Sequence, residues 1–511
     1  MSGTYLLGID LGTSGVKVLL LPSEGSADPV TATVPLSLST PRAGWSEQEP
    51  EDWWQATSEA IRAALREAEV DSANIAAVAV SGQMHGATLL DGEGKIIRPC
   101  ILWNDQRSGE ECAWITDRVG AERLLAAVGN PALAGFTAPK LLWLRKHEPE
   151  NYARIHTVLL PKDYLNYRLT GRLCTEVSDA SGTLLFDVAR RAWSEDIARE
   201  LDIPLAWLPP VKQSTEVIGS VSADAAQQTG LPAGTPVVAG GADNACAAVG
   251  AGVVAPGHVL ASVGTSGTLL APTERPNVDP RGRLHTFCHV VPDTWYVMGV
   301  VLSAGGSLRW LGDVLVTDPS EQSGSDTYAA MMEQAETVPP GSEGLLFLPY
   351  LTGERTPHGD PFARGAFVGL SLRHGRAHLI RSVIEGVTFA LADSAALIRD
   401  LGIDLESVRM TGGGARSVLW RHILADTLRT RVMTTSGEMG PAYGAAIIAG
   451  VGAGVFSSIP VACDQLVAIA SETAPDPEQT EPYSRYHEIY DSLYPAMKAS
   501  FSELARVLGD A

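Results

Sequence analysis

Short apolar runs that end in glycine-rich turns recur along the chain. The run LLGIDLGTSGVKVLLL places such a turn between two apolar stretches, which predicts a hairpin of two buried strands. The segment HVLASVGTSGTLLAP repeats this plan. The two GTSG tetrads begin at Gly12 and Gly264, 252 residues apart and close to half the chain, so we expect two related halves.

Strand-like and helix-like segments alternate along the rest of the chain. Three further apolar runs end in glycine-rich turns, and we expect a helix after each: Ile75 to Gly86, Thr235 to Gly250 and Val408 to Ser417. Helical spacing predicts helices at Glu51 to Ala68, Ala377 to Ile398 and Ser417 to Leu428, and one packed helix from Tyr486 to Leu504. This alternation is typical of mixed α/β layers, so we predict an α/β fold.

Two other stretches affect the predicted organisation. Pro441 to Cys463 is uncharged and about as long as a membrane span, but its glycines and Pro460 favour a buried helix followed by a loop. Thr473 to Thr480, rich in proline and acidic residues, is the best linker candidate. We place the main domain boundary between residues 245 and 257, which gives domains of residues 1–245 and 246–511.

Composition and charge narrow the classes of function. The 511 residues carry a formal net charge of -21, which disfavours nucleic acid and anionic membranes as partners. The same charge would repel ATP, so a nucleotide site would need backbone N–H groups, helix N-termini and Mg²⁺. The six cysteines have no metal-ligand spacing, and the N-terminus has no secretory signal pattern. We therefore expect a cytoplasmic enzyme.

The two GTSG turns are candidates for binding phosphate. Their small residues allow close approach of the backbone, and their N–H and hydroxyl groups can face phosphate oxygens, although a plain hairpin turn is the alternative. Asp10 lies two residues before the first turn, where its carboxylate would suit phosphate only with a cation such as Mg²⁺ between them. The matching position in the second copy is Ser262. The chain lacks the GxxxxGK[ST] loop and the HRD and DFG elements of protein kinases.

From Leu7 to about Ala449 the chain resembles the FGGY family of carbohydrate kinases. The resemblance rests on an ordered series of segments: GIDLGTSGVK, WSEQEPEDWW, SGQMHGATLLD, ILWNDQR, GFTAPKLLWLRKHEP, LLPKDYLNYRLTG, AGGADNACAAVG, SVGTSG and TGGGARS. It implies two actin-like (ribonuclease H-like) domains with a catalytic cleft between them, sugar mostly on the first domain and ATP mostly on the second. It also implies ATP and Mg²⁺ as cofactors, and members are often homodimers.

The resemblance assigns roles to individual residues. Asp243 in GGADNA matches the catalytic base, and Asp10 keeps the catalytic, metal-binding role expected from its place before the first GTSG turn. The residues that match the sugar-binding positions are Gln83, Met84, His85, Asn244 and Trp103, with Asn104 and Asp105 beside them. Gly12 and Thr13, and Thr265 and Ser266, match the phosphate-binding turns, and Gly412, Gly413 and Gly414 match the adenosine-binding turn.

The function expected from this resemblance is ATP-dependent phosphorylation of a ketopentose such as D-xylulose. The QMHG segment favours that branch of the family, but a kinase for ribulose, gluconate, glycerol or a pentitol is an alternative. A second alternative is an actin-like ATPase that works as a chaperone or filament, or a sugar sensor without catalysis. These proteins need the phosphate turns but have no use for Asp243 together with a sugar-binding QMHG loop.

Overall fold

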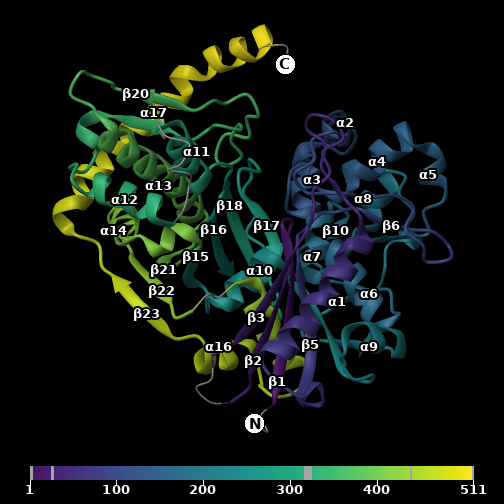
Figure 1. Cartoon of the computed structure of the whole chain (residues 1–511). Helices are drawn as coiled ribbons and strands as arrows, with labels where there is room; N and C mark the ends of the chain where they lie inside the picture. Colours follow the sequence, from purple (N-terminus) through teal and green to yellow (C-terminus); the bar gives the residue numbers. More distant parts are fainter. Residues whose placement is uncertain (1–3, 25–27, 316–324, 438–439, 509–511) are drawn as a thin grey trace.

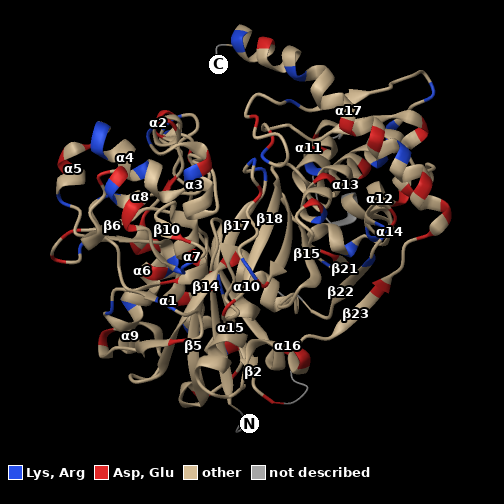
Figure 2. Ribbon diagram, turned by 180° about the vertical axis from the view of Figure 1, so that it is seen from behind, with Lys and Arg blue, Asp and Glu red and all other residues tan. Residues whose placement is uncertain are grey.

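The computed structural model describes residues 4–24, 28–315, 325–437 and 440–508. Figure 1 shows two α/β lobes side by side, with α10 (Asp243–Gly250) near the middle and the C-terminal helix α17 (Pro477–Leu508) across the top of the second lobe. Charged residues follow the outer helices, whereas the central strands are mostly uncharged (Figure 2). No helix among the described residues has the length and apolar character to cross a bilayer.

The first lobe is built on a six-stranded sheet of order β13-β14-β5-β1-β2-β3. Its strands are β1 (Tyr5–Leu11), β2 (Gly15–Pro22), β3 (Val30–Pro35), β5 (Ile75–Gly82), β13 (Val217–Ser220) and β14 (Pro236–Ala242). β1 and β2 form the predicted hairpin, and β1, β5 and β14 run parallel. Helix α1 (Pro50–Glu67) packs on β2 and β3, and α15 (Pro441–Gly452) packs on β1 and β5.

The second lobe repeats this plan in a seven-stranded sheet of order β17-β18-β16-β15-β21-β22-β23. Its strands are β15 (Gly257–Val263), β16 (Gly267–Thr273), β17 (His285–Cys288), β18 (Trp295–Val301), β21 (Leu405–Thr411), β22 (Arg431–Thr435) and β23 (Ile469–Thr473). β15 and β16 form the second predicted hairpin, and β15, β21 and β22 run parallel. Each sheet therefore places a GTSG turn next to the ends of parallel strands, which confirms the two related α/β halves.

The predicted helices α1, α13 (Arg376–Asp400) and α14 (Val418–Leu428) are confirmed with small shifts at their ends, and α17 is confirmed but begins nine residues before Tyr486. The helix expected after Thr235 to Gly250 is wrong, because α10 lies inside that run and Gly250 is followed by a turn and by β15. The helix expected after residues 75–86 is wrong, because that turn leads into the strand β6 (Thr88–Leu90). The linker expected at Thr473 to Thr480 is also wrong: β23 ends at Thr473 and α17 begins at Pro477, so only a short connection remains.

Shorter elements complete the two lobes. In the first lobe they are β4 (Glu47–Gln48), β7 (Cys100–Ile101), α2 (Gly109–Val119), α3 (Ala121–Val128), α4 (Thr137–His147), α5 (Pro149–Ala153), β8 (Thr157–Leu159), α6 (Pro161–Thr170), β9 (Thr175–Glu176), α7 (Val177–Ala180), β10 (Phe186–Asp187), β11 (Ala192–Trp193), α8 (Glu195–Glu200), β12 (Val211–Lys212) and α9 (Ala223–Thr229). Later in the chain they are α11 (Gly305–Leu315), α12 (Ser325–Glu336), β19 (Leu346–Leu348), β20 (Ala366–Val368) and α16 (Ile459–Leu466).

Helix α15 is the buried helix predicted in the uncharged stretch, and it fits tightly between elements of the first lobe. A Cβ built on Gly8 of β1 would lie 1.9 Å from the carbonyl oxygen of Ala442, and one on Gly444 would lie 1.8 Å from that of Cys246 in α10. Only glycine at these two positions lets the backbones approach so closely. A helix from late in the sequence thus belongs to the core beneath the first sheet. The division of the chain at residue 245 stays a prediction.

The hairpin of β17 and β18 also joins the lobes, and we call it the bridging hairpin. It pairs within the second sheet, but its outer strand β17 and the first residue of β18 bond to the first lobe. Cys288 N donates to Ser181 Oγ (3.1 Å), Asn130 Nδ2 donates to Thr286 O (2.8 Å), and Trp295 Nε1 donates to Val188 O (2.7 Å). The sequence patterns did not single out this hairpin.

Candidate active site

Two carboxyl groups meet where parallel strands of the first sheet end. Asp10 in β1 pairs in register with Ser81 in β5, and β14 ends at Ala242, so that Asp243 opens α10. Burial and then the charge of Asp10 raise the pKa of Asp243 to about 7, and burial raises the pKa of Asp10 to about 6. The two groups are therefore electrostatically coupled, as a pair that shares one cation would be.

The QMHG loop, which follows β5, lies beside Asp243. Asn244 connects the two: its backbone N and its Nδ2 donate to Asp243 Oδ1 at 2.7 and 3.0 Å. The same Nδ2 lies 3.8 Å from the sulfur of Met84, which is almost fully buried. The structure thus brings together the predicted base and the predicted sugar-contacting residues.

His85 is held in an unusual backbone conformation. Its φ of +70° lies in the left-handed region that few residues other than glycine adopt. Its Nδ1 lies 2.6 Å from the carbonyl oxygen of Gly182 and must donate to it, which leaves Nε2 as an acceptor. Burial lowers the pKa of His85 to about 3 despite this hydrogen bond, so the ring is neutral at pH 7. A neutral imidazole with a fixed tautomer is suited to accepting a hydrogen bond from a sugar hydroxyl.

Aromatic rings from both lobes surround His85. Phe136 of the first lobe lies 4.5 Å from the His85 ring, and Phe287 of the bridging hairpin lies 6.2 Å from it. His285, two residues before Phe287 and on the same side of β17, stacks on Phe287 at 5.6 Å. Sequence reasoning missed these residues, although the alternation in HTFCH was a signal that one side of a strand is aromatic.

The first GTSG turn is tied to the sugar side of the site. Thr13 Oγ1 donates to Gln83 Oε1 (2.9 Å) and accepts from Trp103 Nε1 (3.0 Å). The hydroxyl predicted to face phosphate is therefore engaged by two predicted sugar-site residues. Gly12 N donates to Gly15 O (3.0 Å), which closes the turn.

Asp105 has a structural position rather than a place in the pocket. Its carboxylate accepts from Ser46 N (2.6 Å) and pairs with Arg107 (2.7 Å).

A second buried charge network lies beneath β14: Lys162 Nζ is 2.6 Å from Asp163 and 3.6 Å from Asp179. Near it, Ser178 Oγ accepts from Ala242 N (3.0 Å) and so fixes the backbone just before Asp243. The methyl group of Ala242 is fully buried in the core.

Three of the predicted nucleotide residues, Thr265, Gly413 and Gly414, line one cavity of the second lobe, whereas Gly12, Thr13, Ser266 and Gly412 do not line it. This cavity of about 550 Å³ contains Gly264 and Thr265 of the second GTSG turn, and Gly413 and Gly414 of the triple-glycine turn. The start of α11 lies against the turn, because Gly305 N donates to Gly264 O (2.8 Å). Ala304 N and Gly306 N likewise donate to Thr265 O, so these first N–H groups of the helix hold the turn in place. Ser266 closes the turn through its carbonyl oxygen, which accepts from Gly264 N (3.0 Å).

An adjoining hollow of about 460 Å³ is lined by both lobes. It contains Gly412 and Gly413 from the second lobe and Lys17 from the first. Gly412 has a φ of +81°, and a Cβ there would lie 2.6 Å from the carbonyl oxygen of Val263. Lys17 pairs in register with Asp10 across the first hairpin. Lys17 was not among the site residues predicted from the sequence.

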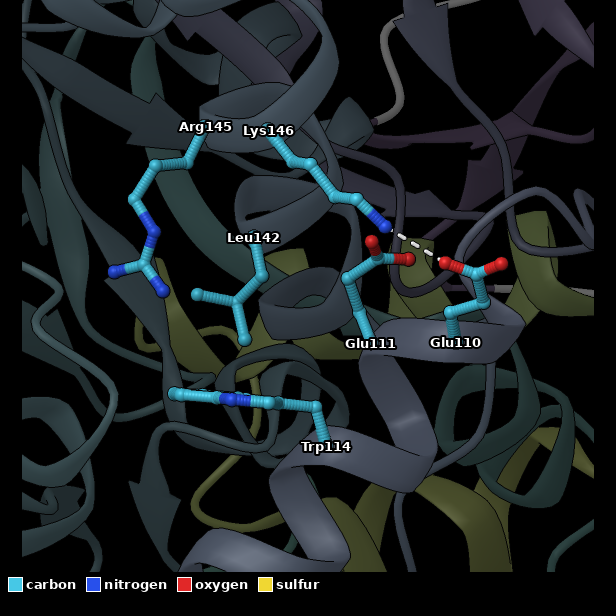
Figure 3. A pocket seen from close by; sticks show the side chains of 6 residues that line it. All are labelled: Glu110, Glu111, Trp114, Leu142, Arg145 and Lys146. Atoms are coloured by element: carbon cyan, nitrogen blue, oxygen red, sulfur yellow. Dashed lines mark hydrogen bonds and ion pairs between the residues drawn. The ribbon is translucent and has the colours of Figure 1, made fainter.

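A separate hollow of about 360 Å³ lies between α2 and α4 (Figure 3). Trp114 and Leu142 form its floor, and Lys146 Nζ pairs with Glu110 at 2.7 Å. None of the predicted site residues lines it. The candidate active site is therefore the region between the lobes.

Comparisons with known proteins agree with this geometry. Residues 5–250 match the N-terminal domain, and residues 259–453 the C-terminal domain, of the FGGY family of carbohydrate kinases. The chain is 40% identical to a xylulose kinase of Bacillus subtilis over 490 residues, 96% of each chain. The solved xylulose kinase of Rhodospirillum rubrum is 32% identical, with a TM-score of 0.88 over 98% of this chain and 100% of the other. A gluconate kinase of Lactobacillus acidophilus is 26% identical, with a TM-score of 0.91 over the same shares.

Proposed function

Because the chain belongs to the FGGY family of carbohydrate kinases, an enzyme family of two-domain actin-like fold that uses ATP, we propose that it phosphorylates D-xylulose to D-xylulose 5-phosphate. The relatives that are named xylulose kinases cover nearly the whole chain, which supports this sugar over the alternatives. The similarity to a gluconate kinase is lower in sequence identity. The observation that carries the proposal is that Asn244 hydrogen-bonds Asp243 and also contacts Met84 of the QMHG loop.

Asp243 is the proposed general base. Asn244 holds its Oδ1, which leaves Oδ2 to orient the 5-hydroxyl of the sugar and to accept its proton as the phosphoryl group is transferred. With a pKa of about 7, Asp243 is a better proton acceptor than an ordinary aspartate and is still substantially ionised at neutral pH.

The two substrates come from opposite sides in this proposal. The sugar lies against Met84 and His85, with Gln83 and Trp103 supporting the loop from the first GTSG turn. The ATP lies in the cavity of the second lobe, with its phosphates at the turn of Thr265 and its adenosine along Gly413 and Gly414. Approach of the lobes would align them and exclude water.

Asp10 would hold Mg²⁺. Its Oδ1 is buried without a hydrogen-bond partner, and an oxygen ligand of this kind fits Mg²⁺. When bound, the ion would neutralise charge on the transferred phosphate and separate it from the two carboxylates. The protein's own part is to place this carboxylate beside Asp243 through the register of β1 and β14 with β5.

The direct test is a coupled assay of ADP release. The purified chain should turn over ATP with D-xylulose at a kcat/KM at least about tenfold above that with D-ribulose, D-gluconate, glycerol or D-arabinitol, because the site must reject a misplaced hydroxyl. Product analysis should place the phosphate on O5. A higher kcat/KM with any other sugar in the panel would contradict the proposed substrate, and no sugar-dependent turnover would favour the sensor or ATPase alternative.

A further inference from the structure

Arg355 lies in the loop between β19 and β20, in the second lobe, and this loop is fastened to the bridging hairpin. Thr356 N donates to Val300 O (3.1 Å), and Val300 N donates to Thr356 Oγ1 (3.0 Å). On the other side, Glu354 Oε1 accepts from Leu302 N (3.0 Å) and from Arg355 N (2.7 Å). The backbone on both sides of Arg355 is therefore fixed to β18.

The guanidinium of Arg355 has no hydrogen-bond or ion-pair partner in the part of the chain that the structure describes. Burial lowers the pKa of Arg355, and the charge of the adjacent Glu354 offsets this only in part, since the Glu354 carboxyl accepts from the backbone N–H groups of Leu302 and Arg355 rather than from the guanidinium. A partly buried cation without an acceptor is costly, and such groups are retained where a ligand supplies the acceptor.

The loop that carries Arg355 lies against the aromatic wall on the sugar side, because Thr356 Oγ1 donates to Arg283 O (2.9 Å), two residues before His285. In agreement with this position, the charge of Arg355 lowers the pKa of His85 and of His285, in both cases after the larger effect of burial. Both rings lie near Phe136, with ring centroids 4.5 and 5.9 Å from it. Arg355 therefore brings a positive charge from the second lobe to the aromatic wall around the QMHG loop.

The chemistry of a 2-ketopentose explains what such a group could recognise. In the furanose form O5 is bonded to C2, so there is no free 5-hydroxyl to phosphorylate. Only the open-chain form has the 5-hydroxyl, and this form also has a carbonyl at C2. A guanidinium donates well to a carbonyl oxygen, whereas a polyol of the same length has no carbonyl to accept.

We propose that Arg355 donates a hydrogen bond to the C2 carbonyl oxygen of the open-chain ketose and so selects it over the furanose and over the corresponding polyol. This inference rests on the proposed function. Arg355 selects a form already present in solution and catalyses no ring opening. It makes the second lobe a contributor to sugar specificity, in addition to its part in binding ATP.

The test compares kcat/KM for D-xylulose and for D-arabinitol, which has CH–OH in place of the carbonyl. In Arg355→Met the value for D-xylulose should fall about 10- to 100-fold, the effect of losing a charge-assisted hydrogen bond, while that for D-arabinitol changes less than about threefold. Arg355→Lys should retain part of the preference for the ketose. Arg373→Met, which removes an exposed arginine of the same lobe, should change neither value.

Equal losses for both substrates in Arg355→Met and Arg355→Lys would indicate a structural role and overturn the inference. An unchanged ratio of the two kcat/KM values would do the same. These results differ from failure of the proposed function, in which the wild-type enzyme itself would not phosphorylate D-xylulose. The KM for ATP should stay within about twofold in every variant, since Arg355 faces the sugar rather than the nucleotide cavity.

Discussion

Replacing Asp243 by Asn should make the enzyme much slower and more stable at the same time. The loss of the base should lower kcat by roughly 10²- to 10⁴-fold. The stability effect follows from the raised pKa. The folded protein keeps a proton on Asp243 up to about pH 7, whereas the unfolded chain releases it near the ordinary aspartate pKa of 3.8. The contribution of this group to stability therefore falls as pH rises from 3.8 to about 7.

The size of this effect can be worked out. At 1.36 kcal/mol per pH unit, a pKa raised from 3.8 to about 7 costs the folded state up to about 4 kcal/mol above pH 7. Asparagine carries no charge and can preserve the hydrogen bonds from Asn244 at its oxygen. The variant should gain most of this free energy at pH 8, and its advantage should shrink steadily as the pH is lowered below 7.

Differential scanning calorimetry of both proteins between pH 5.5 and 8, without ligands, measures the stability, and a coupled assay measures kcat. The expected result is a thermal transition of the variant that lies several degrees higher at pH 8, with an advantage that falls to roughly half, about 2 kcal/mol, at pH 5.5. Equal transition temperatures at pH 8 would refute the electrostatic reasoning. Near-normal kcat would refute the assignment of the base, whatever the stability.

Three further predictions follow from the same geometry. Asp10→Asn should cripple turnover while leaving sugar affinity nearly intact. The acidic limb of its remaining pH profile of kcat/KM should shift to lower pH than in the wild type, because the charge of Asp10 helps to raise the pKa of Asp243. An acidic limb at the wild-type pH would contradict this electrostatic coupling. His85→Ala should weaken discrimination among ketoses more than ATP binding, because the site loses a hydrogen-bond partner of the sugar; calorimetric titrations with a panel of ketoses and with ATP measure both, and an unchanged substrate profile would remove His85 from the pocket. Gly412→Ala should raise the KM for ATP at least about tenfold and leave sugar binding unchanged. The reason is that the φ of +81° and the nearby carbonyl oxygen of Val263 exclude a Cβ at this position. A wild-type KM for ATP would remove this turn from the nucleotide site.

The repeated hairpins could be predicted because their signal is local. An apolar run, a glycine turn and a second apolar run specify a hairpin wherever they occur, and the structure has both. The helix expected after residue 86 failed for the opposite reason. The chain there leaves the sheet and pairs β6 with β8, a contact between segments about 70 residues apart that no local pattern contains.

Only part of the candidate site could be predicted from the sequence. Residues next to glycine turns, such as Asp243, Met84 and Gly413, were found because the resemblance follows contiguous motifs. Arg355 and the aromatic face of β17 were missed, since they reach the sugar side only through packing between the lobes. The hydroxyl of Thr13 was assigned to phosphate, and its bonds to Gln83 and Trp103 depend on contacts across about 70 and 90 residues of sequence.

The place of α15 has a consequence for synthesis on the ribosome. The face of β1 and β5 that α15 covers is complete only when residues up to Gly452 have been made, about 200 residues after β14 and α10. At roughly 5–20 residues per second, the nascent chain carries this apolar face uncovered for about 10–40 s. The two lobes therefore cannot mature one after the other, and the N-terminal half should depend on chaperones during translation until the late helix arrives.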